Sequence, residues 1–528
     1  MAKVTVSGDD AASHSLRRLP RISSAAAIIL ALAMTKLALH LAANALQPYG
    51  YFRDELYYIS CGERLAFGYV DHPPLIALIT RLTTITIGDS IDALRLLPAI
   101  ASAGVVALTG VMARQLGGGW WATTLACIAA MVAPAYLATG GMLTPVAFDH
   151  LVWAACALLL LRLLKTQDPR YWIAVGAVIG VGLQTKHNAA FLAVAVAAGM
   201  LATSNRRYLR SRHLWIGAGL ALLIALPHLL WQIDHGWPTL EFADNASSGK
   251  NAQGGLVDLP LLQIMSMHPL TLPIWLAGLW WCLFSSEGKQ YRMLGLLWAV
   301  PFVLFLIQGG SRPDYLTPAY PPLLAAGAVV LERSRLFARN RWVSVAAMGV
   351  LVAGGLALLP VGVTVLPPTR MESYVRAIGL ADTEAETGKT SVMPQYYADR
   401  FGWESMTATV AEVYASLPEE ERAQATILTG NYGEASAINF FGDAYGLPRA
   451  ISGHNNYYLW GPGDATGEVV IALGIGEEFL RARFEGVEQS AIVTCDHCTS
   501  EENDLPVYVL RQPRRPLAEM WADFKHYN

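Results

Sequence analysis

Apolar runs long enough to cross a membrane recur through the first two thirds of the chain. A run of about 17–25 apolar residues matches a hydrocarbon core roughly 30 Å thick. Only 15% of the 528 residues are charged, against about a quarter in an average soluble domain. The sequence therefore predicts a polytopic α-helical membrane protein with about 11–13 spans. The expected spans lie near 23–47, 93–114, 120–138, 147–164, 171–185, 188–203, 213–231, 260–284, 291–308, 316–332 and 342–366.

The segment between the first two runs, 73–87, has two interpretations. It could be a further span, but it is short, follows two prolines and carries Arg81, which favours an interfacial helix. The same holds for 54–66, where apolar and charged residues fall on separate helical faces. Lys and Arg favour the cytoplasmic side of a membrane. With the tail 1–22 inside, basic clusters fall in the cytoplasmic loops, and the first outer loop, 48–92, lies outside.

The composition changes after the last run. From 367 to 528 no membrane-length run recurs, and charged residues become frequent. "ATILTG" (425–430) is typical of a buried strand, "YGEASAINFFG" (432–442) of a helix, and "GEVVIALGIG" (467–476) of another strand. We therefore expect a cytoplasmic tail (1–22), a transmembrane domain (23–366) and a C-terminal soluble α/β domain (367–528) on the outer face.

Ionisable residues beside the runs gather on the outer side under this topology. Such residues are costly at membrane depth and usually face a cavity or one another. A carboxylate there could take a proton from a hydroxyl, and Lys, Arg or His could hold a phosphate. The pattern predicts one outward-facing cavity, used for group transfer from a lipid-linked phosphate or for proton-coupled transport. The residues are Asp54, Glu55, Asp71, His72, Asp149, His150, Lys186, His187, Asp234, His235, Arg312 and Asp314.

Other charges near the runs have simpler interpretations. Lys36 and His40, inside the first run, are expected to snorkel or to pair with a neighbour. The net charge of −3 gives no reason to expect a nucleic-acid partner. We expect solvated positions at Glu63, Arg64, Arg81, Arg95, Asp234 and His235.

Several motifs, taken in order, resemble the C-type glycosyltransferases of the protein O-mannosyltransferase and aminoarabinose–lipid A transferase group. "FRDELYYISCGERLAFGYVDHPPLIALITRL" (52–82) resembles the first outer loop of that family, and "MLTPVAFDHLVWAACALLLLRLL" (142–164) its second acidic motif. "GVGLQTKHNAAFL" (180–192) is similar to a Thr-Lys segment, and "YLTPAYPPLLAAGA" (315–328) to a Tyr-Leu-x-Pro span. "GNYGEASAINFFG" and "SGHNNYYLWGPG" look like the soluble tail of bacterial members.

The resemblance implies an inverting transfer of a sugar from a polyprenyl-phosphate carrier to an acceptor hydroxyl, on the outer face of a bacterial inner membrane. Asp54 would be the general base, Glu55 would orient the acceptor or support Asp54, and Asp149 would be the second acidic residue. The acceptor could be a lipid, a glycan or a protein, and a divalent cation is compatible with the wider class. A secondary transporter or lipid flippase is the alternative, against which the missing inverted repeat counts.

Further site residues follow from the same resemblance. His72 departs from relatives that have Lys before Pro-Pro, so phosphate binding there needs a proton stabilised by Asp71 or by the phosphate. The expected donor-phosphate ligands are Lys186, His72, Arg53 and Arg312. The expected acceptor or sugar contacts are Asp71, His150, His187, His454, Asn455, Tyr457 and Trp460.

Two motifs of the soluble part keep open alternatives. Aromatic faces and amides in "GHNNYYLWGPG" suit sugar binding, or a packed loop that covers the transmembrane cavity. Cys495 and Cys498 suit a disulfide in an oxidising compartment, with free thiols or a metal pair with His497 as alternatives. The single Gly of "NYGEA" is a weak phosphate signal.

Overall fold

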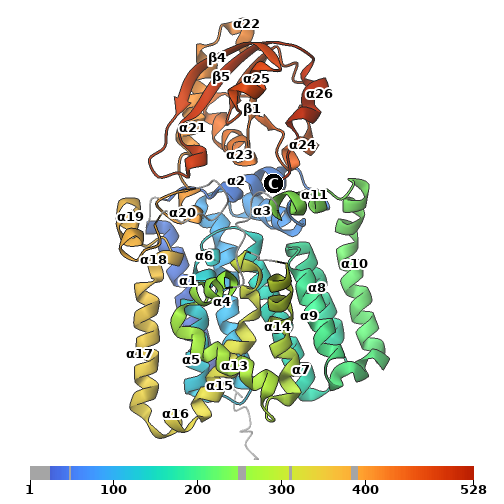
Figure 1. The fold of residues 1–528 in the computed structure, drawn as a ribbon, viewed down its shortest axis with the longest axis vertical. Coiled ribbons are helices and arrows are strands. Elements are labelled where there is room, and N and C mark those ends of the chain that lie inside the picture. Colours follow the sequence, from blue (N-terminus) through green and yellow to red (C-terminus); the bar gives the residue numbers. More distant parts are fainter. Residues whose placement is uncertain (1–23, 47–48, 248–256, 309–311, 382–389) are drawn as a thin grey trace, which may run out of the picture.

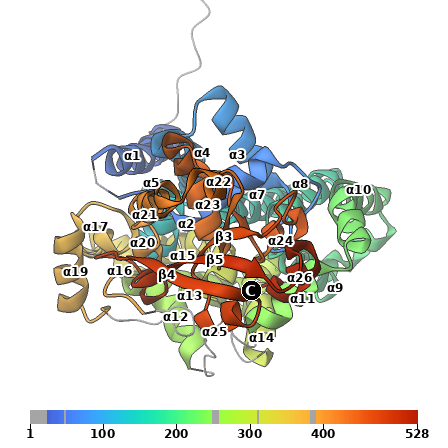
Figure 2. The same ribbon diagram turned by 90° about the horizontal axis from the view of Figure 1, so that it is seen from above.

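The computed structural model describes residues 24–46, 49–247, 257–308, 312–381 and 390–528, so the predicted tail 1–22 lies outside the described residues. A helical bundle forms one end of the molecule and a β-sheet domain the other, with short helices between them (Figure 1). Seen from above, the sheet domain covers the centre of the bundle, while α10 and α17 lie at its margins (Figure 2). This arrangement confirms the predicted fold class.

Every predicted apolar run is helical in the structure. Five helical segments of the described part are long and apolar enough to span a membrane: α1 (Ser24–Leu46), α4 (Ile91–Gln115), α7 (Pro145–Thr166), α10 (Arg212–Asp234) and η4 with α14 (Lys289–Ile307). Three bent pairs can serve as spans too: α5 (Trp120–Val132) with α6 (Pro134–Gly140), α9 (Ala189–Leu201) with η1 (Ser204–Arg210), and α12 (Asp258–Ser266) with η3 and α13 (Pro269–Phe284). The remaining runs are the shorter α8 (Tyr171–Thr185), α15 (Pro321–Arg333) and α17 (Arg341–Ala357). By length and apolar composition, up to eight spans are therefore present in the described part of the chain. The predicted number of about 11–13 spans stays a prediction.

Prolines begin the second half of two bent pairs. α5 and α6 meet at 63°, where Pro134 follows Ala133, and Pro269 begins the second half of the 94° pair. Proline lacks the N–H that would continue the hydrogen-bond ladder of the preceding helix. Lys36 uses a carbonyl near the first bend, because its Nζ donates to the oxygen of Met131 at 3.0 Å. Of the two predicted alternatives for Lys36, the structure therefore supports pairing with a neighbour, since its side chain is completely buried and does not snorkel.

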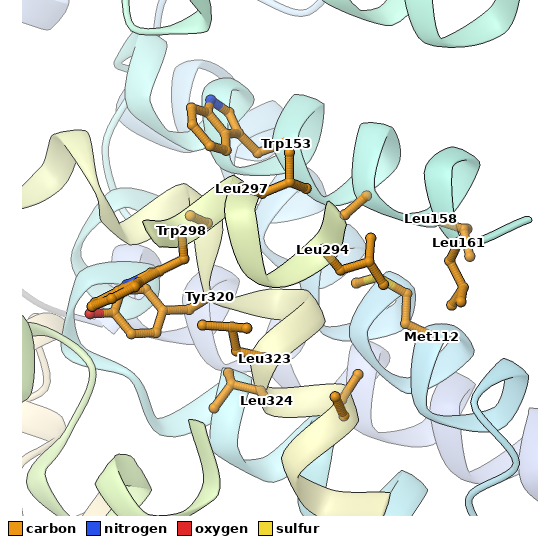
Figure 3. Close-up of a cluster of buried hydrophobic side chains, with 14 of the residues drawn as sticks. Met112, Trp153, Leu158, Leu161, Leu294, Leu297, Trp298, Tyr320, Leu323 and Leu324 are labelled. Carbon is orange, nitrogen blue, oxygen red and sulfur yellow. The ribbon is translucent and has the colours of Figure 1, made fainter. Parts of the chain in front are cut away.

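Large apolar side chains and closely approaching glycines pack the bundle. Leucines and tryptophans from α7, α14 and α15 fill its interior (Figure 3). A Cβ on Gly217 of α10 would overlap the carbonyl of Trp172 on α8, and one on Gly327 would overlap that of Ile274. Small residues allow such close helix contacts, which association in lipid requires.

The C-terminal domain contains a five-stranded sheet in the order β2-β1-β3-β5-β4. β1 is parallel to β2 and β3, and the other neighbouring pairs are antiparallel. The two predicted strands and the helix between them are confirmed, but β2, β4 and β5 were not predicted. The strands are β1 (Ala425–Thr429), β2 (Ile451–Ser452), β3 (Val469–Leu473), β4 (Phe484–Val493) and β5 (Leu505–Pro513). The helices are α19 (Pro368–Ala377), α20 (Gln395–Ala398), α21 (Trp403–Ser416), α22 (Glu419–Arg422), α23 (Tyr432–Phe441), α24 (Asn456–Trp460), α25 (Glu477–Arg481) and α26 (Leu517–Met520).

The first outer loop and the C-terminal domain share one hydrophobic core. Side chains of α2 (Arg53–Glu63) and of α3 (Leu75–Thr86) pack in the same cluster as α21, α23 and one face of the sheet. α3 keeps Leu82 and Ile85 exposed, as an interfacial helix should. α2 does not, because all its residues except Asp54 and Glu63 are buried. The prediction of an interfacial helix was therefore wrong for α2, which is buried against the C-terminal domain.

Candidate active site

Asp54 lies in the first turn of α2 and faces the C-terminal domain. Its Oδ1 accepts a hydrogen bond from the hydroxyl of Tyr432, the first residue of α23, at 2.8 Å. The Arg53 Nε lies 3.9 Å from the same oxygen, and 26% of the Asp54 side chain is exposed. The carboxylate is therefore held at one oxygen and still partly accessible, as a general base requires.

Arg53 is buried behind Asp54 among acidic residues. Its guanidinium lies 3.6 Å from Asp399 and 3.7 Å from Glu501, and 5.4 Å from the centre of the Tyr432 ring. These contacts place Arg53 in the junction with the C-terminal domain, so its predicted role as a donor-phosphate ligand stays a prediction.

Two further buried acids lie beyond Arg53, joined by one amide. The Asn431 Nδ2 donates to Glu434 and to Glu502, each at 3.0 Å. Burial raises the pKa of Glu434 well above its usual value, with the charge of Glu502 adding to the effect. Burial, and then the charge of Glu501, raise the pKa of Glu502 to about 7.

Glu55, next to Asp54, is completely buried and bonded at both oxygens. It accepts from the Nε and NH2 of Arg95, each at 2.8 Å, and from the amides of Phe52 and Leu143, each at 2.9 Å. Burial alone would raise the pKa of Glu55, but the charge and hydrogen bonds of Arg95 outweigh it and lower the pKa. Arg95 is only 1% exposed, so its prediction as a solvated residue was wrong.

Asp71 closes the first outer loop and also contacts the C-terminal domain. Its Oδ1 accepts from the Tyr57 hydroxyl at 2.9 Å and from the Asn456 Nδ2 at 3.3 Å. Asn456 accepts in turn from the amide of Val70 at 3.1 Å. Burial raises the pKa of Asp71, although the nearby His72 acts in the opposite direction.

His72 is buried with its tautomer fixed by the backbone. Its Nδ1 lies 2.9 Å from the carbonyl oxygen of Pro73, which can only accept, so Nδ1 carries the proton. The Nε2 is buried and has no hydrogen-bond partner within the described part of the chain. The ring stacks on Tyr69 at 4.6 Å and meets Tyr58 edge-on at 5.0 Å. The rings of Tyr58 and Tyr69 therefore hold His72 in place within the first outer loop.

The second group of site residues lies at the ends of membrane helices. Lys186, in the turn between α8 and α9, pairs with Asp314 at 2.5 Å and lies 4.9 Å from the ring of Tyr315. Burial opposes its charge, but Asp314 prevails and raises the pKa of Lys186. Asp149 of α7 accepts from the Asn188 Nδ2 at 2.7 Å and lies close enough to Lys186 for their charges to interact.

Three more predicted site residues accompany Lys186. His150 contacts the Thr317 hydroxyl at 2.8 Å, and Arg312 interacts electrostatically with Asp314. The Nε2 atoms of His187 and His228 are 3.1 Å apart, and the His228 Nδ1 lies 3.2 Å from the carbonyl of Phe67 in the first loop. Because that carbonyl only accepts, His228 donates through Nδ1 and accepts from the Nε2 of His187.

The predicted sugar-binding loop packs against the first outer loop. The Tyr457 hydroxyl contacts Ser60, Ser436 and Asn439, each at 3.0 Å. Trp460 lies edge-on to Tyr457 and stacks under the guanidinium of Arg64 at 4.7 Å. The geometry supports the packed-loop alternative, and sugar binding by Tyr457 and Trp460 stays a prediction.

His454 and Asn455 take part in the packing of the same loop. The His454 ring lies 4.9 Å from the Tyr432 ring, so this histidine supports the residue that bonds Asp54. Asn455 is only 1% exposed and donates its backbone N–H to the carbonyl of His526 at 3.1 Å. Sugar binding by either residue stays a prediction.

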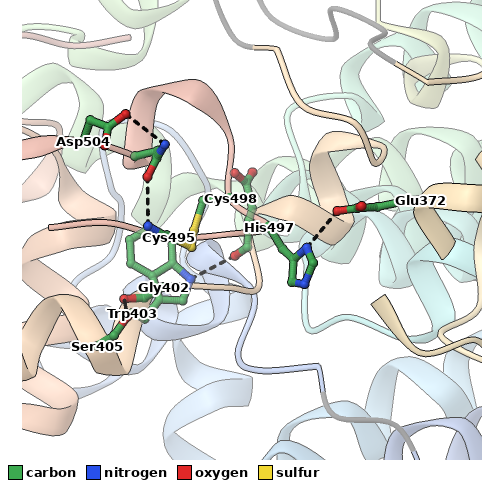
Figure 4. The surroundings of a disulfide bond; sticks show 10 residues. Glu372, Gly402, Trp403, Ser405, Cys495, His497, Cys498 and Asp504 are labelled. Atoms are coloured by element: carbon green, nitrogen blue, oxygen red, sulfur yellow. Dashed lines mark hydrogen bonds and ion pairs between the residues drawn. A yellow bond between two sulfur atoms is a disulfide. The ribbon is translucent and has the colours of Figure 1, made fainter. Parts of the chain in front are cut away.

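A disulfide joins Cys495 to Cys498 just before Glu501 (Figure 4). Gly402 lies against it with a φ of +87°, and a Cβ there would meet both sulfurs. His497 bonds Glu372 at 2.8 Å (Figure 4). No group of three or more His, Cys, Asp or Glu side chains in the described ranges is arranged to hold a metal ion, so a divalent cation stays a prediction.

The structure thus brings the predicted residues into two adjoining groups. Tyr58 lies within electrostatic range of Asp54 and Asp71, and His187 within range of His72 and Lys186. Sequence reasoning missed Tyr432, Asn188 and His228. Tyr432 carried a usable signal, because it follows β1 where parallel strands end, and ligand sites gather at such ends.

Part of the chain is similar in sequence to a known family of glycosyltransferases. Residues 71–231 match a family model described as dolichyl-phosphate-mannose-protein mannosyltransferase, less than a third of the chain. The matched part contains Asp71, His72, Asp149 and Lys186 but not Asp54. The match and the fold agree with the resemblance of the motifs to C-type membrane glycosyltransferases.

Two crystal structures of ArnT from Cupriavidus metallidurans share the fold. The chain is similar to ArnT bound to undecaprenyl phosphate with a TM-score of 0.60 and 16% identity, over 92% of this chain and 97% of that one. The apo form gives a TM-score of 0.58 at the same identity and coverage. No curated protein matches the chain. Identity this low shows the fold alone, so the reaction is argued from the site.

Proposed function

We propose that the protein is an inverting glycosyltransferase, which moves a sugar from a polyprenyl-phosphate carrier to an acceptor hydroxyl on the outer face of a bacterial inner membrane. The observation that carries this proposal is the partly exposed Asp54, held at one oxygen by Tyr432, beside a separate group of cations. The match to a mannosyltransferase model and the likeness to a structure that binds undecaprenyl phosphate support it.

The two groups suit the two halves of such a reaction. Asp54 takes the proton of the acceptor hydroxyl as its oxygen attacks the anomeric carbon. The bond from that carbon to the phosphate oxygen breaks on the opposite face, and its electron pair leaves with the phosphate. Lys186 and its neighbours stabilise the departing anion. A single in-line displacement of this kind inverts the anomeric centre.

The residues near Lys186 keep it charged or contact the donor phosphate. Asp314 and Asp149 keep Lys186 charged. When a phosphate enters, it competes with Asp314 for the ammonium group. His72 is the second proposed phosphate ligand, through the buried Nε2 that has no hydrogen-bond partner within the described part of the chain, and Arg312 lies beside Asp314.

A transfer assay tests the proposal. Purified protein is given radiolabelled polyprenyl-phosphate sugars of several kinds with membrane extract as acceptor. We expect transfer with at least one donor, and a loss of about 10²- to 10⁴-fold in Asp54→Asn, the range for general-base catalysis. Asp234→Asn is the matched control, because the Asp234 side chain is 83% exposed at the same end of the bundle.

Two results would contradict the proposal. Transfer by Asp54→Asn at the wild-type rate would remove Asp54 from the mechanism. Absence of transfer with every donor, together with vectorial uptake of the lipid or a solute in liposomes, would support the transporter or flippase instead.

A further inference from the structure

Tyr432 connects the C-terminal domain to the first outer loop at Asp54. Its hydroxyl donates to Asp54 Oδ1 at 2.8 Å across 378 positions of sequence. A carboxylate oxygen that accepts such a bond has a defined orientation, and the other oxygen is then the one left for an incoming hydroxyl. The bond therefore selects which oxygen of Asp54 can act as the base.

The position of Tyr432 is fixed from several sides. Asn431 caps α23, and Glu434 completes a capping box that holds the first helical turn. The Tyr432 ring lies 4.5 Å from the ring of Tyr57 and 4.9 Å from that of His454. The Arg53 guanidinium covers the ring at 5.4 Å. Few alternative positions are left for the hydroxyl.

The glycine after Tyr432 serves the same contact. A Cβ on Gly433 would lie 2.6 Å from the Cγ and 2.7 Å from the Cδ of Arg53, closer than such atoms approach. The "NYGEA" motif therefore lets α23 meet α2 without displacing Arg53 or the neighbouring Asp54. Gly433 allows the close approach of the two helices, and this role explains the glycine without a bound phosphate.

We infer that Tyr432 is a positioning residue of the active site, through which the C-terminal domain aims the carboxylate of Asp54 at the acceptor. The inference rests on the proposed function, since Asp54 is its base. It makes the C-terminal domain part of the catalytic site and not only its cover. Misplacing a catalytic group by about 1 Å can cost on the order of 100-fold in rate.

The kinetic test compares full-length Tyr432→Phe with Tyr414→Phe. Tyr414 lies on α21 of the same domain, and its hydroxyl donates to the carbonyl of Arg422. We expect Tyr432→Phe to lower kcat roughly 10- to 100-fold while the donor KM stays within about two-fold of wild type. Tyr414→Phe should leave both unchanged. Gly433→Ala should reproduce the kcat loss, because it displaces Arg53. An unchanged kcat in Tyr432→Phe, or a fall matched by a rise in donor KM, would overturn the inference.

A second measurement separates this inference from the proposed function. Thermal midpoints are determined for Tyr432→Phe, Asp54→Ala and the double variant. If the hydroxyl acts through Asp54, Tyr432→Phe lowers the midpoint of the wild type but not that of Asp54→Ala. An equal fall in both backgrounds refutes the contact. If wild type transfers no sugar while this coupling is observed, the proposed function fails and the pairing of Tyr432 with Asp54 stands.

Discussion

The two groups of the site differ in what holds them. The first-loop carboxylates, Asp54, Glu55 and Asp71, are fixed by the C-terminal domain and the start of the bundle. The helix-end group, Lys186, His187 and His228, is held by Asp314, by the contact between the two histidines and by the carbonyl of Phe67. The geometry of the acids therefore depends on the soluble domain, and that of the helix-end group on the packing of helices in lipid.

Because the two groups are held by different parts of the molecule, we expect changes near them to affect different kinetic parameters. Changes that loosen the junction with the C-terminal domain should lower kcat, because they misplace the base. Changes at the helix ends should raise the donor KM, because they weaken phosphate binding. A variant that moves both parameters equally would show that the two groups act as one unit.

The largest effect is expected from removing a first-loop carboxylate that is completely buried. Glu55→Ala leaves Arg95 buried without its partner, and breaking such a pair costs about 3–5 kcal/mol of stability. Thermal unfolding in detergent with size-exclusion chromatography measures this loss. Glu63→Ala is the control, since the Glu63–Arg449 pair is exposed and should contribute about 1 kcal/mol or less. A Glu55→Ala protein as stable as wild type would mean that Arg95 finds another partner.

A pH-dependent effect comes next, from the acids behind Arg53. Glu502 has a pKa raised to about 7 by burial, so the folded state binds its proton more tightly than the unfolded state does. Stability should therefore fall as pH rises from about 4.5 to 7, by roughly 3 kcal/mol in total. Glu502→Gln keeps the oxygen that Asn431 bonds and should flatten this fall.

Thermal midpoints at pH 5 and pH 8 measure this difference. The exposed Glu478→Gln on α25 is the control and should keep the wild-type slope. A Glu502→Gln protein with an unchanged slope would assign the pH dependence to Glu434 or to another group.

Much of the fold could be predicted, because membrane-length runs and alternating strands are local patterns. The start of each span and the strand at 425–430 depend only on residues nearby in sequence. The surroundings of Arg95 and α2 could not be predicted in this way. Arg95 is held by Glu55 of the first loop, and α2 is buried by a domain that follows more than 300 residues later, and no local pattern records either contact. β4 was also missed, because an edge strand exposed on most of its length has no clear apolar alternation.

Most residues of the candidate site could be named from the sequence, but their partners could not. Asp54, Asp149 and Lys186 stand beside apolar runs, where a charge is conspicuous. Glu55 has the same local context as Asp54, yet its carboxylate is occupied by Arg95 while that of Asp54 remains partly exposed. One helical position separates them, and only the tertiary structure shows which residue is available for chemistry.

A smaller effect is expected at Lys186. If Lys186 binds the donor phosphate as proposed, Lys186→Met removes one charge-assisted bond, worth about 1.5–3 kcal/mol, or roughly a 10- to 100-fold rise in donor KM. The kcat at saturating donor should change much less, in contrast to Tyr432→Phe. Initial-rate kinetics over a range of donor concentration measure both, with the exposed Lys289→Met as control. A fall in kcat with donor KM unchanged would place Lys186 with the acids instead.

The smallest effect tests whether helix packing alone sets the positions of Lys186, His187 and His228. Gly217→Ala places a Cβ against the carbonyl of Trp172, which forces α10 away from α8 and His228 away from His187. We expect a rise of a few fold in donor KM, with kcat and the pH dependence of unfolding unchanged, because the contact displaced first is that of His228 with His187 and not that of Asp54 with Tyr432. Gly219→Ala is the matched control, since a Cβ there meets nothing within 4 Å. If Gly217→Ala lowers kcat as Tyr432→Phe does, a shift of α10 reaches Asp54 through Phe67 and the first loop. The two groups would then be mechanically coupled through the loop that they share.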